Sequence, residues 1–173
     1  GECPNAQTFT SSAGTAKAFP QNANTGTCAP AANAAAFNNA ISQIYERWTR
    51  RFVVTDGGGA HVIAPEQENG VTTSESMGYG MLIAAAMGDK AAFDRFWTYV
   101  SDPSRLVNGL MVWKPSGGSG SATDGDVDIA YALKMADAQW GGYATAADAM
   151  IAAIQARDVD PTNNHLKAGD SWD

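Results

Sequence analysis

Apolar residues recur at steps of three and four positions over much of the chain, which is typical of helices with one buried face. The first such segment, 31–52, ends at a polar run containing three consecutive glycines. A second helix is expected over Glu75–Met87, after the N-cap candidates Thr72–Ser74. Three more follow: one with Phe93, Phe96, Trp97 and Val100 on one face, then Asp124–Trp140 and Thr145–Ala156.

The segments between these helices show no convincing strand alternation. Leu110–Trp113 is a short apolar run that fits either a strand or a buried loop, and Lys114–Ser121 has the composition of a flexible linker. Residues 1–30 form an irregular arm, and Arg157–Asp173 is polar and rich in turn residues. The pattern therefore predicts an all-α fold of antiparallel helices. Because stacked helix pairs need partners on both sides, five helices indicate part of a ring or stack.

The composition of the 173 residues favours one folded domain with a lean core. Hydrophobic residues make up 45% of the chain, but many of them are alanine. A net charge of −7 and an aromatic content of 9% are not those of a disordered chain. We therefore expect many contacts between small residues, and a core that is completed by something outside this sequence.

The same composition excludes several classes of protein. With 11 Lys and Arg residues against 18 Asp and Glu and no basic cluster, the chain lacks the charge that nucleic-acid binding needs. The apolar stretches are broken by charges before the about 20 residues of a membrane span. The two histidines and two cysteines form no metal-spaced cluster, so we expect no metal and no organic cofactor.

The N-terminal arm bears on the cellular location. The sequence starts at Gly1 without an initiator Met or an apolar leader, as a processed secreted protein would, although a start created for expression would look the same. Cys3 and Cys28 are either two free thiols or a disulfide that stabilises the arm by restricting the unfolded chain. An oxidising compartment, extracellular or periplasmic, favours the disulfide.

Two segments carry candidate chemistry. In Thr73–Met81 (TSESMGYGM), Glu75 falls in the first turn of a helix, where it either complements the helix dipole or serves as a general acid. In Ser121–Asp128 (SATDGDVD), the acids Asp124, Asp126 and Asp128 alternate at the start of another helix.

The alternating acids allow three interpretations. The first is a calcium-binding loop, which the segment matches poorly because the spaced Gly and the terminal Glu of that motif are absent. The acids could simply cap the helix, with Asp124 as N-cap. Alternatively, one of them faces the same cleft as Glu75, and paired carboxylates are what hydrolysis of a glycosidic bond requires. Trp113 and Tyr79 lie close to these acids in sequence, and such aromatic rings either stack on sugars or fill the core.

These motifs resemble those of family 8 of the glycoside hydrolases. The segment Ala122–Asp126 (ATDGD) is similar to the signature of that family, together with the residues that follow it, Ile129, Ala130, Ala132, Leu133, Ala136 and Trp140. Ser74–Met81 (SESMGYGM) is similar to its other marker, with Ser76 where Gly is common, and Asn108–Pro115 (NGLMVWKP) fits between them. The resemblance extends from about Phe37 to Asp173.

The resemblance implies an (α/α)6 barrel with a substrate cleft at one end, of which 31–173 would form the N-terminal half. It implies secreted or periplasmic bacterial enzymes that cleave β-1,4-linked polysaccharides with inversion. By position, Glu75 would be the general acid, Asp124 would bind and distort the sugar, and Trp113 would stack on it. Tyr79 would lie in the cleft wall, and Asp126 would support the structure.

The length departs from the family, whose members are about twice as long and whose general base lies in the second half. No residue here matches that base. The sequence therefore predicts an incomplete endo-β-1,4-glucanase, completed by a second polypeptide or truncated. Chitosan and xylan are alternative substrates, and a noncatalytic carbohydrate-binding module is an alternative of another class.

Overall fold

The computed structural model describes residues 34–64 and 70–171. The arm 1–30, with Cys3 and Cys28, lies outside the described residues, so the predicted disulfide stays a prediction. The order of the elements is α1 (Ala34–Phe52), β1 (Val53–Asp56), β2 (Gly59–Val62), α2 (Ser74–Met87), α3 (Lys90–Val100), β3 (Leu106–Val107), β4 (Leu110–Met111), α4 (Thr123–Trp140) and α5 (Ala144–Arg157).

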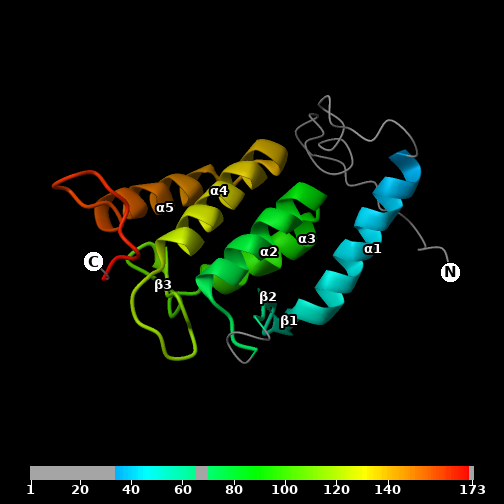
Figure 1. The fold of residues 1–173 in the computed structure, drawn as a ribbon, viewed down its shortest axis with the longest axis horizontal. Coiled ribbons are helices and arrows are strands. Elements are labelled where there is room, and N and C mark those ends of the chain that lie inside the picture. Colours follow the sequence, from blue (N-terminus) through cyan, green and yellow to red (C-terminus); the bar gives the residue numbers. More distant parts are fainter. Residues whose placement is uncertain (1–33, 65–69, 172–173) are drawn as a thin grey trace.

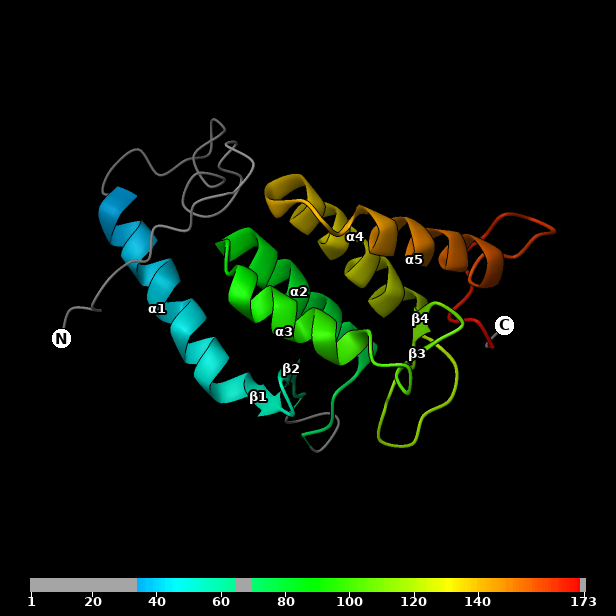
Figure 2. The ribbon, with the colours of Figure 1, turned by 180° about the vertical axis from the view of Figure 1, so that it is seen from behind.

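The helices form two layers. Helices α2 and α4 lie on the face seen in Figure 1, and α3 and α5 lie behind them, as the view from the opposite side in Figure 2 shows. Each back helix follows its front partner after a short turn, so the pairs α2–α3 and α4–α5 are antiparallel neighbours. Helix α1 lies at the edge of this array (Figure 1), where the Tyr45 hydroxyl donates a 2.8 Å hydrogen bond to Asp89.

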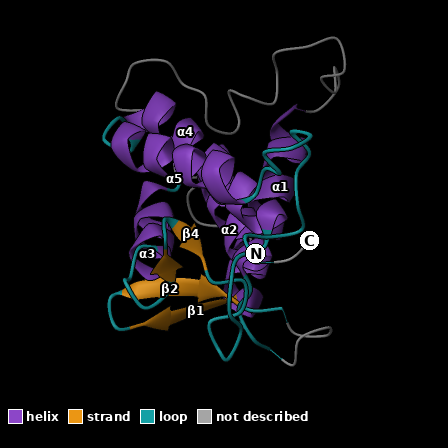
Figure 3. Ribbon diagram, turned by 90° about the vertical axis from the view of Figure 1, so that its left-hand side faces the viewer, coloured by secondary structure: helices purple, strands orange, loops and turns teal. Residues whose placement is uncertain are grey.

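Of the short strands, the sequence indicated only one, within the apolar run Leu110–Trp113, where β4 lies. Two short antiparallel hairpins, β1–β2 and β3–β4, lie near one end of the helices (Figure 3). The first begins where α1 ends and turns at Gly57 and Gly58, both of which have positive φ. Such a turn suits the twist of paired strands, and Asp-Gly is a strong hairpin signal. The all-α class still holds, because the hairpins only connect helices.

The core is lean, as the composition suggested. Small residues and methionines let the helices approach closely, and only two phenylalanines are fully buried among the described residues. The buried set includes Ala84, Ala85, Ala92, Ala130, Ala132, Ala136 and Ala147, with Met77, Met81, Met111 and Met150 between them and Phe93 and Phe96 at the centre.

Candidate active site

The start of α2 positions Glu75. Thr73 is the N-cap, as its sequence position predicted: its hydroxyl oxygen accepts a 3.2 Å hydrogen bond from the Ser76 amide. The Ser76 hydroxyl oxygen in turn accepts a 3.0 Å bond from the Thr73 amide, which completes a capping box. Glu75 therefore stands in the first turn with its side chain exposed.

The start of α4 positions Asp124. This helix begins at Thr123 with Ala122 as N-cap, and no side chain caps it. Asp124 therefore does not cap the helix; its Oδ1 atom accepts a 2.7 Å hydrogen bond from the Gly125 amide, and its side chain is exposed.

Glu75 and Asp124 meet in one cleft of about 750 Å³. This volume is within the usual range for small-molecule sites. Trp113, from the loop after β4, forms part of the wall, whereas Asp126 and Tyr79 are not among the lining residues. The cleft is lined by Ala64, Thr73, Ser74, Glu75, Trp113, Ala122, Thr123, Asp124, Val127, Asp128, Leu166, Lys167 and Ala168.

Two glycines allow α2 and α4 to cross closely at this cleft. A Cβ atom at Gly78 would lie 2.6 Å from the Cβ of Asp128, and one at Gly125 would lie 2.7 Å from the backbone N of Glu75. Both separations are far below van der Waals contact. The two glycines therefore set the spacing between the helix that carries Glu75 and the helix that carries Asp124.

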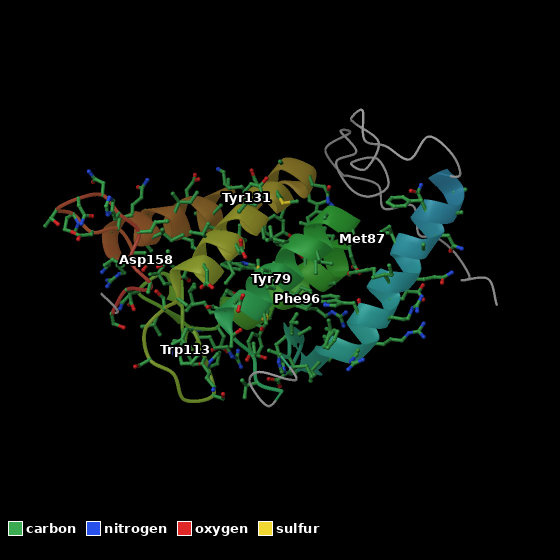
Figure 4. All side chains as sticks on the ribbon, in the orientation of Figure 1. Tyr79, Met87, Phe96, Trp113, Tyr131 and Asp158 are labelled. Carbon is green, nitrogen blue, oxygen red and sulfur yellow. The ribbon has the colours of Figure 1, made fainter. Side chains whose placement is uncertain are left out.

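Tyr79 lies one turn after Glu75, on the exposed face of α2 (Figure 4). Its hydroxyl donates a 2.9 Å hydrogen bond to Oε1 of Glu75. That bond to the carboxylate raises the pKa of Tyr79, so its hydroxyl keeps its proton and remains a donor.

Asp128 is a third carboxyl group of the cleft. It is one of the three alternating acids of which the sequence analysis expected one to face the same cleft as Glu75. Burial raises the pKa of Asp128, and the negative charges of Asp124 and Glu75 raise it further. The cleft therefore concentrates three acids from two helices, beside one lysine, Lys167.

Asp126 does not line the cleft and is fully buried. Its Oδ1 atom accepts a 2.9 Å hydrogen bond from the Met111 amide of β4. Burial raises the pKa of Asp126 to about 7, although the hydrogen bond from the Met111 amide lowers it. This position agrees with a supporting rather than a substrate-binding residue.

Residues 166–168 form a wall of the cleft that the sequence analysis missed. The Thr123 amide donates a 3.0 Å hydrogen bond to the Ala168 carbonyl, which places this segment beside the start of α4. Gly169 permits the approach, because a Cβ there would lie 2.1 Å from the Ser121 carbonyl oxygen. No local periodicity marks such a contact, and Gly169 was its only sequence signal.

The loop 114–121 is held at both ends despite its linker-like composition. The Trp113 amide donates to the Gly120 carbonyl at 2.9 Å, and the Ser121 amide donates to Asp170 at 2.9 Å.

Within residues 34–64 and 70–171, no three His, Cys, Asp or Glu side chains are grouped so that they could hold a metal ion. In particular, Asp124 lines the cleft while Asp126 is buried, so the alternating acids do not converge on one ion. No helix in the same ranges is long and apolar enough to cross a membrane.

Two layers of antiparallel helices, with carboxylates at two helix starts in one cleft, agree with part of an (α/α)6 barrel that carries a polar active site. The sequence model of glycosyl hydrolases family 8 matches residues 19–173. The chain belongs to this family, and it forms part of the family's (α/α)6 barrel.

Individual relatives agree with this assignment. The chain is 35% identical to a beta-glucanase of Niallia circulans, over 78% of this chain and 37% of that protein. It is 34% identical to endoglucanase C of Ruminiclostridium cellulolyticum, over 78% of this chain and 32% of that protein. The chain thus spans about a third of the length of these curated relatives.

The solved structures give the same picture. The beta-1,3-1,4-glucanase of Paenibacillus sp. X4 superposes with a TM-score of 0.70 at 38% identity, over 79% of this chain and 40% of that one. Rex8A of Paenibacillus barcinonensis, complexed with xylose, superposes with a TM-score of 0.65 at 22% identity, over 76% of this chain and 43% of that one. The second likeness shows the fold alone.

Proposed function

We propose that this chain forms the acid-bearing part of an inverting endo-β-1,4-glucanase. The observation that carries the proposal is the meeting of Glu75, Asp124 and Trp113 in one cleft at the starts of two helices. Membership of a glycosidase family whose relatives include endoglucanases supports a β-glucan as the substrate.

In this mechanism Glu75 protonates the glycosidic oxygen of the leaving sugar. The hydroxyl of Tyr79, which donates to Oε1, fixes the orientation of the carboxyl group. Asp124 binds the sugar at the cleavage point and holds it in a distorted ring conformation, while Trp113 stacks on a sugar face. A second carboxylate, about 6.5–9.5 Å from the acid, activates the water that inverts the anomeric carbon.

We place that base outside these 173 residues, in a segment or second polypeptide that completes the barrel. The front face of α2 and α4 supports this, because it exposes Tyr79 and Tyr131 by 51% and 61% (Figure 4), and Val127, in the cleft wall, is 41% exposed. Exposed apolar groups in such a row mark a surface that packs against something else. We further propose that the completed enzyme acts outside the cytoplasm, on polymeric substrate.

The test compares the chain alone with the completed barrel on soluble β-1,4-glucan. We expect reducing ends from the completed barrel only, and proton NMR should show the α-anomer forming first. Turnover by the chain alone, or initial formation of the β-anomer, would contradict the proposal. Xylan and chitosan in parallel test the alternative substrates, and glycan binding without any reducing ends would indicate a noncatalytic module.

Removing the hydroxyl of Tyr79 should weaken catalysis moderately. Tyr79→Phe removes one exposed hydrogen bond to Glu75, so we expect kcat/KM on β-glucan to fall roughly three- to tenfold. The matched control is Tyr131→Phe, which removes an exposed hydroxyl from the same face of the helices. Equal losses in both variants would show that the hydrogen bond to Glu75 is not the cause.

A further inference from the structure

A pair of buried acids lies behind the cleft. Asp126 belongs to the first turns of α4, and Asp158 directly follows α5 (Figure 4). Both residues are fully buried. Oδ1 of Asp126 accepts from the Met111 amide at 2.9 Å, and Oδ1 of Asp158 accepts from the Ser121 hydroxyl at 3.3 Å. Among the described residues, the Oδ2 atoms of both acids have no hydrogen-bond partner.

This pair has too few donors for two ionised carboxylates. The Ser121 hydroxyl has one proton, which it gives to Asp158, and its oxygen accepts a 3.2 Å bond from the Asp170 amide. The Thr123 hydroxyl also lies near Asp158 and lowers its pKa. A second negative charge would therefore leave Oδ2 of Asp126 buried without a donor, which costs folding free energy. A proton on one carboxyl removes one charge and supplies a new O–H donor.

The pair is connected to three walls of the cleft. The Met111 amide, which donates to Asp126, lies two residues before Trp113. The Trp113 carbonyl in turn accepts a 2.9 Å hydrogen bond from the amide of Ser74, which precedes Glu75. The Asp158 carbonyl accepts a 2.7 Å bond from the amide of Lys167, a lining residue.

We propose that Asp126 and Asp158 form a positioning pair that holds one proton, carried by Asp126, and that this proton keeps the walls of the cleft together. The effect on the cleft rests on the proposed function, whereas the shared proton does not. Loss of that proton places a second charge in the pair and loosens the contacts of Met111 and Ser121.

The charges around the pair favour this protonation. Burial raises the pKa of Asp126 to about 7, and the negative charges of Asp158 and Asp170 contribute to the increase. Burial also raises the pKa of Asp158, but the Ser121 hydroxyl lowers it; the charge of Asp170 raises it, and Lys167 and the Thr123 hydroxyl lower it. Asp158 is therefore the acid that is better able to carry the charge. The partners from β4 and from the loop before α4 are uncharged, namely the Met111 amide and the Ser121 hydroxyl.

The first experiment follows the pH dependence of urea unfolding of the full chain. A carboxyl whose folded pKa is raised stabilises the fold at low pH and loses that contribution as the pH rises through the folded value. With a folded pKa of about 7 for Asp126 and an unfolded value of about 3.9, the wild type should lose stability relative to Asp126→Asn between pH 5 and pH 8. Over this pH range, the equilibrium constant for unfolding of the wild type should increase on the order of a hundredfold relative to that of Asp126→Asn.

Asp126→Asn is a suitable variant because its amide oxygen still accepts from Met111 and its amide NH2 replaces the proposed O–H. Asp148→Asn, at an exposed carboxyl of α5, is the control and should follow the wild type. Asp158→Asn removes the neighbouring charge and should reduce the pH dependence. Parallel pH profiles for the wild type and Asp126→Asn would overturn the proposal.

Carbon-13 NMR of the side-chain carboxyls gives a second readout that needs neither turnover nor unfolding. One aspartate of the wild type should titrate near pH 7, and its signal should be absent in Asp126→Asn. Titration of Asp126 below about pH 4.5 would overturn the proposal.

The effect on the cleft is measured in the completed enzyme. The ratio of kcat/KM at pH 8 to that at pH 6 should be higher in Asp126→Asn than in the wild type, and unchanged in Asp148→Asn. If the wild type were inactive, only the proposed function would be contradicted. The NMR and unfolding results would still show whether Asp126 carries a proton near neutral pH. An unchanged ratio in an active enzyme would overturn the positioning role.

Discussion

Glu75→Gln is expected to lower kcat of the completed enzyme on β-glucan about a hundred- to ten-thousandfold. The leaving sugar of an unactivated glucan departs as a poor alkoxide unless its oxygen receives a proton, and general acid catalysis is worth about 10²–10⁴ in rate. Gln has nearly the same shape as Glu and still accepts the hydrogen bond from Tyr79, so the loss should reflect chemistry rather than packing. The measurement is kcat on soluble β-1,4-glucan near neutral pH.

An aryl glycoside separates an acid from a structural residue. Because a nitrophenolate leaves without protonation, Glu75→Gln should retain much more of its activity on a nitrophenyl oligosaccharide than on glucan. Glu46→Gln, at an exposed carboxylate of α1 that pairs with Arg50, is the control and should change neither rate. Near-normal turnover of glucan by Glu75→Gln would remove Glu75 from the mechanism, and equal losses on both substrates would indicate a structural role.

The helices could be predicted because their signals are local. The segment Glu75–Met87 was expected from its apolar spacing and the N-cap candidates before it, and α2 spans Ser74–Met87 with Thr73 as its cap. Similarly, Asp124–Trp140 became α4, which begins one residue earlier at Thr123. Each of these signals lies within a few residues of the element that it predicts.

The first hairpin was missed because its strands are short. β1 has only four residues, three of them exposed, so no alternation of buried and exposed positions develops. The sequence Asp56-Gly57-Gly58 was interpreted only as the end of a helix. The same residues form the turn of a hairpin, for which Asp-Gly is a known signal.

The site was predictable only in part, because its contacts are remote in sequence. Glu75 and Asp124 stood out as acids at two helix starts, and both line the cleft. Asp158 lies 37 positions from Ser121, with which it forms a buried hydrogen bond. A single acid after a helix gives no indication of such a partner. The close approach of Gly125 to the backbone of Glu75 was equally hidden.

Gly125→Ala should reduce kcat/KM on β-glucan on the order of a hundredfold. The added Cβ would lie 2.4 Å from the Ser74 hydroxyl oxygen and 2.7 Å from the Glu75 amide nitrogen. Because the second atom belongs to the backbone, α2 and α4 must move apart or the first turn of α2 must shift. A misplacement of about 1 Å in a catalytic group can cost a hundredfold in rate. Stability should change less, since overpacking costs about 1–3 kcal/mol and Ala regains about 1 kcal/mol as the better helix former.

Gly80→Ala is the matched control, because it places a similar clash on α2 away from Asp124. Its Cβ would lie 2.6 Å from a methyl group of Val62, which belongs to the hairpin rather than to the cleft. We expect urea unfolding to show comparable changes in stability for the two variants, but a much smaller loss of kcat/KM for Gly80→Ala. Equal losses of activity would mean that packing in general, and not the spacing between Glu75 and Asp124, limits the rate. A larger loss of kcat/KM for Gly125→Ala than for Gly80→Ala would identify the separation of α2 and α4 as a determinant of catalysis.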